Sequence, residues 1–238
     1  MRDFLYFRPM KFIDIHTHQK KQNNDTIHIY NCIVKNEMSK LEKKINFSAG
    51  IHPWFLDDFN EKFKKLIKFS KEKNCIAIGE CGLDYQKKYL EKFSKKKQIE
   101  YFEKQILLAE KTKKPLIVHS VKSIDDVIKI KKENNSFVPW IIHGFTKNKQ
   151  TAKQLIDNGF YLSFGTKLFS NIKNQEALKS IPINRILLET DDSHTDIKDL
   201  YKFVAKLIGI NISDLVNQIY NNFNLIFNFT SKYTRQTH

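Results

Sequence analysis

The chain has 238 residues, of which 41% are hydrophobic and 13% aromatic, so it can bury a large core and does not belong to the disordered or low-complexity classes of protein. No stretch approaches the roughly 20 apolar residues of a membrane-spanning helix, so we expect no membrane partner. The formal net charge of +15 comes mostly from lysine, since only four of the basic residues are arginine, and it is compatible with a nucleic-acid substrate without being evidence for one.

Short apolar runs alternate with longer amphipathic segments along the chain, which is the pattern of an α/β protein. We expect strands at Lys11–His16, Thr26–Cys32, Ile45–Ile51, Cys75–Gly79, Pro115–His119, Val138–His143, Phe160–Phe164 and Arg185–Glu189. We expect helices at Asp58–Lys73, Lys95–Thr112, Ser123–Lys132, Asn148–Asn158, Asp196–Leu207 and, at the C-terminal end, residues 211–228.

Eight strands that alternate with helices over this length predict a (β/α)8 barrel of the TIM type. We expect residues 1–238 to form a single domain, with residues 1–9 as an N-terminal extension and the charged run Lys87–Lys97 as a solvated loop. In such a barrel the chemistry lies at the carboxyl ends of the strands.

Two histidines, His16 and His18, follow the apolar run that forms the first predicted strand. Side chains at positions i and i+2 of a strand point to the same face, so both imidazoles can bind one metal ion. Such a pair alone is more often a half-exposed polar pair than a metal site, and the ends of the other strands therefore decide between the two interpretations.

Those other strand ends carry the residue types that a metal site needs. His52 follows the third predicted strand, Glu80 the fourth, His119 the fifth, His143 the sixth and Asp191 the eighth. Imidazole and carboxylate together suit Zn²⁺, Mn²⁺ or Fe²⁺, and with added water Mg²⁺.

Six candidate ligands are too many for one tetrahedral ion but fit two, because a carboxylate can bridge ions about 3.5–4 Å apart. We therefore expect two divalent metal ions per chain, Zn, Mn or Mg, held by His16, His18, Glu80, His119, His143 and Asp191. Glu80 is the expected bridge. Asp191 joins the first-strand pair, because the eighth strand lies beside the first in a closed barrel.

The ordered motifs DIHTH, GIHPW, IGECGLDY, PLIVHS, IIHGF and LLETD, which lie between residues 12 and 193, together resemble the TatD family of metal-dependent hydrolases. The resemblance implies a TIM-like barrel and divalent-metal-dependent hydrolysis of phosphodiesters, usually in DNA. It implies that His16 and His18 bind one ion, that His119 and His143 bind the other, and that Glu80 bridges them. It further implies that Asp191 binds metal and takes the proton of the attacking water, and that His52 faces the substrate.

The chain departs from this family at one position. Many members carry an arginine two residues after the histidine of the fifth strand, where this chain has Val121 followed by Lys122. If that arginine holds a substrate phosphate, the chain has lost it or uses Lys122 instead, and lysine lacks the planar fork of arginine.

The sequence therefore predicts a two-metal hydrolase of phosphodiester bonds, with Glu80 and Asp191 as catalytic residues, His52 and Lys122 as substrate-binding residues, and DNA as substrate and partner. Two alternatives stay open. The first is hydrolysis of an ester, amide or aminoacyl-tRNA bond, which stays open because Val121 stands where many family members have arginine. The second is a nucleic-acid-binding barrel without catalysis, against which the two intact acids argue.

Three cysteines without C-x-x-C spacing, Cys32, Cys75 and Cys81, indicate free thiols in a reducing compartment. The first residues lack the long apolar core of a secretory signal, so we expect a cytoplasmic protein. Because no coiled coil or surplus apolar stretch demands a partner, we expect a monomer.

Overall fold

Eight parallel strands form one sheet, in which each strand pairs with the next along the chain. The computed structural model describes residues 11–20, 24–34 and 45–227, and the predicted extension at residues 1–9 lies outside them. The strands are β1 (Phe12–Thr17), β2 (Thr26–Ile33), β3 (Phe47–Gly50), β4 (Cys75–Asp84), β5 (Leu116–Val121), β6 (Trp140–Ile142), β7 (Phe160–Phe164) and β8 (Ile186–Leu188). This order of parallel neighbours confirms the predicted (β/α)8 barrel.

The first and last strands of the sheet meet through a residue that follows β8. Thr17 of β1 forms a parallel bridge with Asp191. The main-chain N–H of Asp191 donates to the carbonyl oxygen of His16 (2.9 Å), and the N–H of His18 donates to the carbonyl oxygen of Asp191 (3.1 Å). The barrel therefore closes at the level of the predicted metal ligands.

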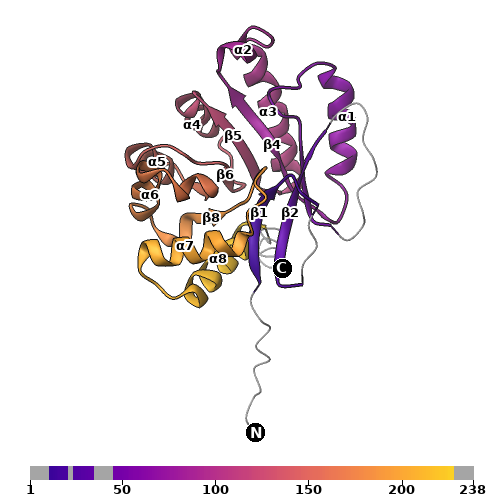
Figure 1. Cartoon of the computed structure of the whole chain (residues 1–238). Coiled ribbons are helices and arrows are strands. Elements are labelled where there is room, and N and C mark those ends of the chain that lie inside the picture. Colours follow the sequence, from indigo (N-terminus) through magenta and orange to yellow (C-terminus); the bar gives the residue numbers. More distant parts are fainter. Residues whose placement is uncertain (1–10, 21–23, 35–44, 228–238) are drawn as a thin grey trace, which may run out of the picture.

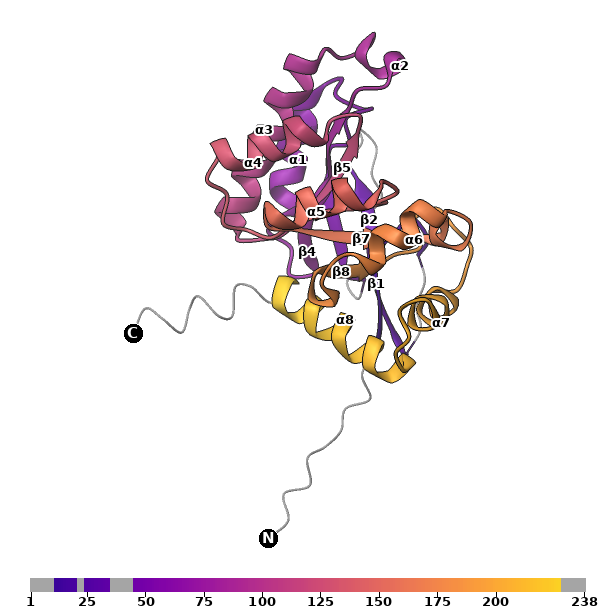
Figure 2. The same cartoon turned by 90° about the vertical axis from the view of Figure 1, so that its left-hand side faces the viewer.

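The helices lie outside the sheet (Figures 1 and 2). They are α1 (Phe59–Phe69), α2 (Lys87–Leu90), α3 (Lys95–Thr112), α4 (Ile124–Glu133), α5 (Lys149–Asp157), α6 (Ile172–Lys179), α7 (Ile197–Ile208) and α8 (Ile212–Phe227), with 3₁₀ turns η1 (Thr166–Phe169) and η2 (Ile183–Arg185). The last two helices contact both β1 and β8, so the C-terminal part of the described chain covers the seam of the barrel. None of the described helices has the length and apolar character needed to cross a membrane.

Two helices differ from the sequence prediction. The run Lys87–Lys97 is not a loop throughout, because it contains α2 and the start of α3, where the Ser94 hydroxyl accepts the N–H of Lys97 (3.3 Å). Helix α2 has a single turn and buries no residue, so hydrophobic periodicity cannot indicate it. Helix α6 was not predicted, since it is short and Ala177 and Leu178 are the apolar residues that it buries.

Strand β4 is longer than the predicted Cys75–Gly79, and the extension places Glu80 inside the strand. The register between β4 and β5 is irregular around this point. Gly79 and Gly82 have φ of 146° and 135°, and a Cβ at either position would lie 2.5 Å or less from a carbonyl oxygen of β5. Only glycine fits there, so the two glycines around Glu80 allow β4 to approach β5 closely while it presents this acid at the mouth of the barrel.

The core beneath the site consists of large apolar side chains between the sheet and the helices. The fully buried Trp140 ring of β6 makes edge contacts with Phe102 of α3 (5.5 Å between centroids) and Phe160 of β7 (5.8 Å). Such aromatic contacts add to the hydrophobic gain from burial. They fix β6 against its neighbours and thereby position His119 within β5 and His143 after β6.

Candidate metal centre

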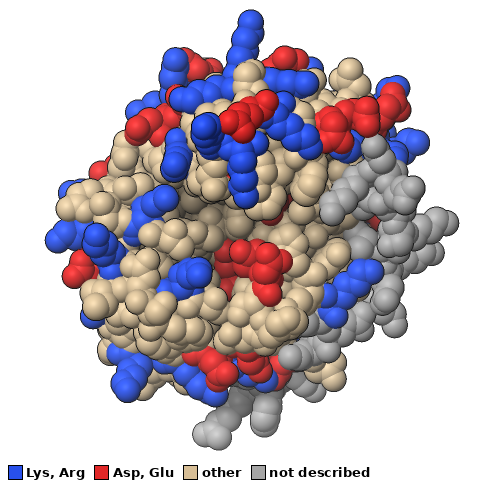
Figure 3. All heavy atoms as spheres, turned by 45° about the horizontal axis from the view of Figure 1, so that its top comes forward, with Lys and Arg blue, Asp and Glu red and all other residues tan. Residues whose placement is uncertain are grey.

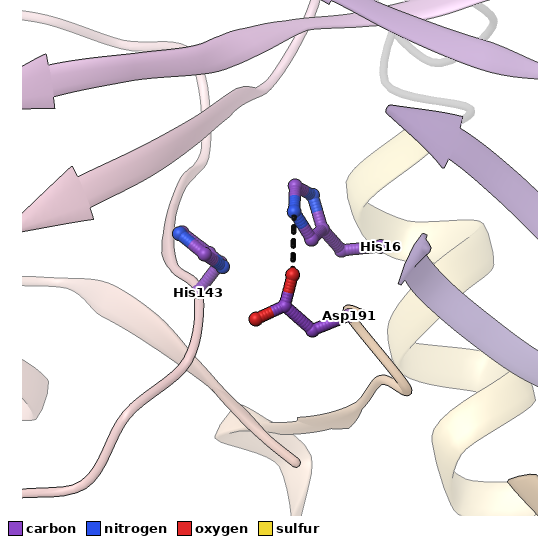
Figure 4. A group of neighbouring side chains, drawn as sticks. All are labelled: His16, His143 and Asp191. Atoms are coloured by element: carbon purple, nitrogen blue, oxygen red, sulfur yellow. Dashed lines mark ion pairs between the residues drawn. The ribbon is translucent and has the colours of Figure 1, made fainter. Parts of the chain in front are cut away.

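The six predicted ligands and His52 come together at the carboxyl ends of the strands. They come from β1 (His16) and the residues after it (His18), from the end of β3 (His52), from β4 (Glu80) and β5 (His119), and from the segments after β6 (His143) and β8 (Asp191). Figure 4 shows how three of them, His16, His143 and Asp191, point toward one another from separate elements. Ligand atoms of this trio, of His16–His18–Glu80 and of His52–Glu80–His119 each lie within 4.8 Å of one another.

The Glu80 carboxylate lies at the centre of the cluster, and its two oxygens face different partners. Oε1 lies 2.8 Å from His143 Nε2, 2.9 Å from His119 Nδ1 and 3.1 Å from His52 Nε2. Oε2 faces the opposite group and lies 3.6 Å from His16 Nε2. One buried carboxylate therefore separates two sets of imidazoles, which is the arrangement of a bridging ligand.

Asp191 faces the pair on β1. Its Oδ1 lies 3.4 Å from His18 Nε2 and 3.6 Å from His16 Nε2. The residue has a φ of 52°, a region that aspartate and asparagine enter more readily than most residues. Its side chain is 40% exposed, whereas His16 is fully buried, so Asp191 is the acid of this group that meets solvent and an incoming molecule.

Three further polar side chains hold the candidate ligands in place. Asn31 of β2 donates from Nδ2 to Glu80 Oε2 (2.8 Å), and its Oδ1 accepts the main-chain N–H of Glu80 (3.2 Å). Asp84 Oδ2 lies 3.2 Å from His119 Nε2 and accepts the indole N–H of Trp54 (2.7 Å). Glu189 Oε1 lies 3.4 Å from His143 Nδ1. Such partners fix the orientation of ligating groups.

Asp14 of β1 lies beside the metal centre, and its carboxylate contacts His28 Nδ1 of β2 (3.2 Å). Its carboxylate also accepts the N–H and the hydroxyl of Thr190, over 2.9 and 2.7 Å. Asp14 therefore orients a histidine that stands outside the cluster, and it connects β1 to the segment that carries Asp191.

Sequence reasoning missed Asn31 and Glu189. Glu189 stands two residues before Asp191 in the LLETD motif, so strand alternation could have indicated that both acids reach the same side. Its Oε1 accepts the main-chain N–H of Gly144 (2.6 Å), which anchors the segment after β6. Asn31 carries no such signal, because one asparagine in an apolar strand does not reveal which acid it meets.

The two predicted substrate-binding residues lie in different places. His52 is buried, and its ring centroid lies 4.4 Å from that of His119, so it packs directly against the candidate ligands. Lys122 is exposed and lines a neighbouring cavity of about 500 Å³. Val121 lines a smaller cavity of about 200 Å³ that reaches His119, His143 and Asp191.

Burial and neighbouring charges set the protonation of the cluster. Burial, followed by the nearby His143, lowers the pKa of His16 to about 3, so this imidazole is neutral and keeps a lone pair. Burial opposes ionisation of Asp191, but the hydrogen bond with His18 and the proximity of His16 lower its pKa to about 2. For Glu80, burial again opposes ionisation, and His143 and His52 hold its pKa well below the usual range. Both acids are thus ionised at neutral pH.

The residues present fit a divalent cation. Imidazole nitrogens and carboxylate oxygens are the donors that Zn²⁺, Mn²⁺ and Fe²⁺ take in proteins. Although burial disfavours its charge, Glu80 raises the pKa of His143 well above the usual range. The same negative potential attracts a metal ion.

A parallel barrel that collects imidazoles and carboxylates at this end defines the class of metal-dependent hydrolases. The family model described as "TatD related DNase" matches residues 16–228, and the chain belongs to this TatD family. The resemblance that the six motifs indicated is therefore confirmed.

Relatives of known sequence or structure agree. A protein of Buchnera aphidicola subsp. Baizongia pistaciae, named an uncharacterized metal-dependent hydrolase, is 31% identical over 94% of this chain and 91% of its own. YcfH of Escherichia coli K12 carries the same description and is 30% identical over 76% of this chain and 73% of its own. The crystal structure of YJJV, a TatD homolog of Escherichia coli K12, superposes with a TM-score of 0.77 over 92% of this chain and 98% of that one, at 18% identity, and so shares the fold.

Proposed function

We propose that this metal-dependent hydrolase cleaves phosphodiester bonds in single-stranded DNA, with two divalent ions, Zn, Mn or Mg, at the cluster. The observation that carries the proposal is the division of the Glu80 carboxylate between two groups of imidazoles. In this assignment His16, His18 and Asp191 would hold one ion, His119 and His143 would hold the other, and Glu80 would be a ligand of both. When bound, such ions supply an activated water near neutral pH and neutralise charge on phosphoryl oxygens.

The residues of the chain divide the remaining work. Asp191 is ionised and partly exposed, so its carboxylate accepts the proton of the attacking water. Glu80 and the buried histidines fix the geometry of the metal centre. Asp84 orients the ring of His119, and Glu189 orients the ring of His143. The lining of the cavity that reaches His119, His143 and Asp191 positions the phosphodiester.

The choice of DNA is supported by the description of the family that matches the chain, "TatD related DNase". The net charge of +15 favours the approach of a polyanion. Free, buried thiols at Cys32, Cys75 and Cys81 agree with a reducing compartment, and we propose a cytoplasmic monomer.

Incubation of the purified chain with single-stranded DNA and Mg²⁺, Mn²⁺ or Zn²⁺ tests the proposal. We expect metal-dependent cleavage that disappears in Glu80→Gln and persists in Glu176→Gln, an exposed acid on α6. Metal content of both variants is measured in parallel by elemental analysis. Absence of cleavage with every metal, or equal cleavage by the two variants, contradicts the proposal.

A second candidate is hydrolysis of an ester, amide or aminoacyl-tRNA bond by the same centre. Val121 favours it, because a branched apolar side chain lines the cavity where many family members carry arginine. A panel that compares a phosphodiester, a carboxylic ester and an amide at equal concentration separates the two functions by the ratio of their kcat/KM values.

A further inference from the structure

A second cavity, of about 500 Å³, opens beside the metal centre. Its lining includes Tyr85, Lys95, Lys122 and Lys147. It shares Lys147 and Ile124 with the smaller cavity that reaches His119, His143 and Asp191, so the two cavities adjoin. Its volume lies in the range of about 300–1,000 Å³ that bound organic ligands occupy.

The charges of this cavity favour an anion. Its three lysines outnumber the two acids that also line it, Asp125 and Asp126. Each acid accepts a hydrogen bond within the cavity wall, Asp126 from the hydroxyl of Tyr85 (2.7 Å) and Asp125 from the side-chain amide of Gln154 (3.2 Å). In the part of the chain that the structure describes, none of the three lysines forms an ion pair. Lys95 lies over the Tyr85 ring at 4.4 Å, a position from which its ammonium group still meets solvent.

The charged residues on the surface continue from the metal centre toward the larger cavity. Figure 3 shows the mouth of the barrel as a hollow with acidic atoms at its middle and Lys and Arg side chains around much of its rim. Lys147 borders both cavities, whereas Lys95 and Lys122 border only the larger one. Positive charge therefore continues outward from the place where a scissile phosphodiester would lie.

We propose that the cavity of Lys95, Lys122 and Lys147 binds the phosphate backbone of single-stranded DNA next to the bond that is cleaved. The inference rests on the proposed phosphodiesterase function and adds the place where the strand binds beyond the cleaved bond, a contact that a mononucleotide diester cannot make. Three separate ammonium groups along a large open cavity suit a chain of phosphates better than one isolated phosphate.

Binding of DNA in the presence of a chelator tests the site without activity. The triple variant Lys95→Gln, Lys122→Asn, Lys147→Gln is compared with Lys173→Gln, Lys179→Gln, Lys206→Gln, which removes the same charge from exposed positions on α6 and α7. Asparagine is chosen at position 122 because the residue there has a φ of 55°. The probe is a fluorescein-labelled single-stranded oligothymidylate of about 12 nucleotides, and Kd is measured by anisotropy over a range of salt concentrations.

We expect the cavity variant to bind about tenfold or more weakly and to lose about 2 from the slope of log K against log salt, at about 0.7 for each of three phosphate contacts. The control variant should change by less than about twofold, as exposed charges at a distance are screened. Equal losses in the two variants overturn the proposal. Should the triple variant fail to fold by circular dichroism, Lys122→Asn against Lys173→Gln is the same test with one contact.

The source of the phosphate is distinguished by competition. Backbone binding predicts that an unlabelled oligonucleotide displaces the probe and that inorganic phosphate at the same phosphate concentration does not. Displacement by inorganic phosphate as effective as that by the oligonucleotide overturns the backbone assignment. If the wild-type chain binds through the cavity but cleaves no DNA, the proposed function fails while the site stands; if it cleaves DNA and both variants bind alike, the site fails while the function stands.

Discussion

Asp191 and His16 are joined twice: the main-chain N–H of Asp191 donates to the carbonyl oxygen of His16 over 2.9 Å, and Asp191 Oδ1 lies 3.6 Å from His16 Nε2. The first contact closes the barrel and the second builds the candidate metal centre. The position of the carboxylate is thus fixed by closure of the sheet, so a test of its chemistry must leave the main chain unchanged.

Asp191→Asn leaves the main chain unchanged, because asparagine adopts a φ of 52° readily and keeps the size of the side chain. Loss of the negative oxygen removes the proposed metal ligand and the proposed proton acceptor. We expect kcat to fall by about 100-fold or more, in the range of general acid–base contributions, with unchanged circular dichroism. Asp192→Asn is the control, since Asp192 is exposed and its Oδ1 lies 3.9 Å from His18; a similar loss in that variant would contradict the special role of Asp191.

Glu189→Gln tests the buried acid behind His143. The amide oxygen can still accept the Gly144 N–H, but the negative charge 3.4 Å from His143 Nδ1 is lost. We expect metal affinity, measured by titration with Mn²⁺ or Zn²⁺, to fall by about 10–100-fold, as with other residues that orient ligands. Glu176→Gln serves as the matched control, and equal affinities in the two variants would show that Glu189 acts only in folding.

Metal should stabilise the native chain. An ion that binds the native state alone at about 100 times its Kd adds about 2.7 kcal/mol, which for a protein of this size corresponds to a rise in Tm of about 5–10 °C. We expect this rise in scanning fluorimetry with Zn²⁺ or Mn²⁺ and its loss in Glu80→Gln. A rise of equal size in the variant would place the stabilising ion elsewhere.

The order of the strands predicted which candidate ligands lie together, but not every side chain that holds them. Because parallel strands of a barrel end at one rim, His16, Glu80 and Asp191 could be brought together from sequence positions far apart. Glu189 was missed because the strand pattern assigned it to the end of an apolar run, and its burial depends on the N–H of Gly144, which belongs to another strand connection.

The direction of the Lys122 side chain could not be predicted from the sequence. Its place next to Val121 suggested a substitute for arginine in the same cavity. The positive φ of Lys122 turns the chain, and its side chain lines the larger cavity instead. A local backbone angle of this kind cannot be predicted from the hydrophobic pattern of the sequence. Helix α6 and the extension of β4 could not be predicted from that pattern either.

The three thiols should be inert in the native chain. Cys32 is 4% exposed, and Cys75 and Cys81 are fully buried. Burial raises the pKa of Cys32 to about 12 and that of Cys75 to about 11, so neither is a thiolate at neutral pH. We expect no reaction with a thiol reagent at pH 8 without denaturant and three modified cysteines per chain after unfolding in guanidinium. A fast-reacting thiol in the native chain would contradict this packing.

Val121→Arg tests whether the apolar lining limits the binding of phosphodiesters. Val121 lines the cavity of His119, His143 and Asp191, so an arginine there places a planar fork beside the position of a phosphoryl group. We expect KM for a phosphodiester to fall by about 3- to 10-fold, equivalent to about 0.7–1.4 kcal/mol, and KM for a neutral ester to stay the same.

Two companion variants separate charge, shape and bulk at this position. Val121→Lys supplies a positive charge without the fork, and Val121→Met fills similar space without charge. A gain confined to arginine assigns the effect to bidentate recognition, and a gain shared with lysine assigns it to charge alone. If arginine and methionine behave alike toward the phosphodiester, the valine does not limit phosphate binding, and the alternative of a carboxylic ester or amide substrate gains support.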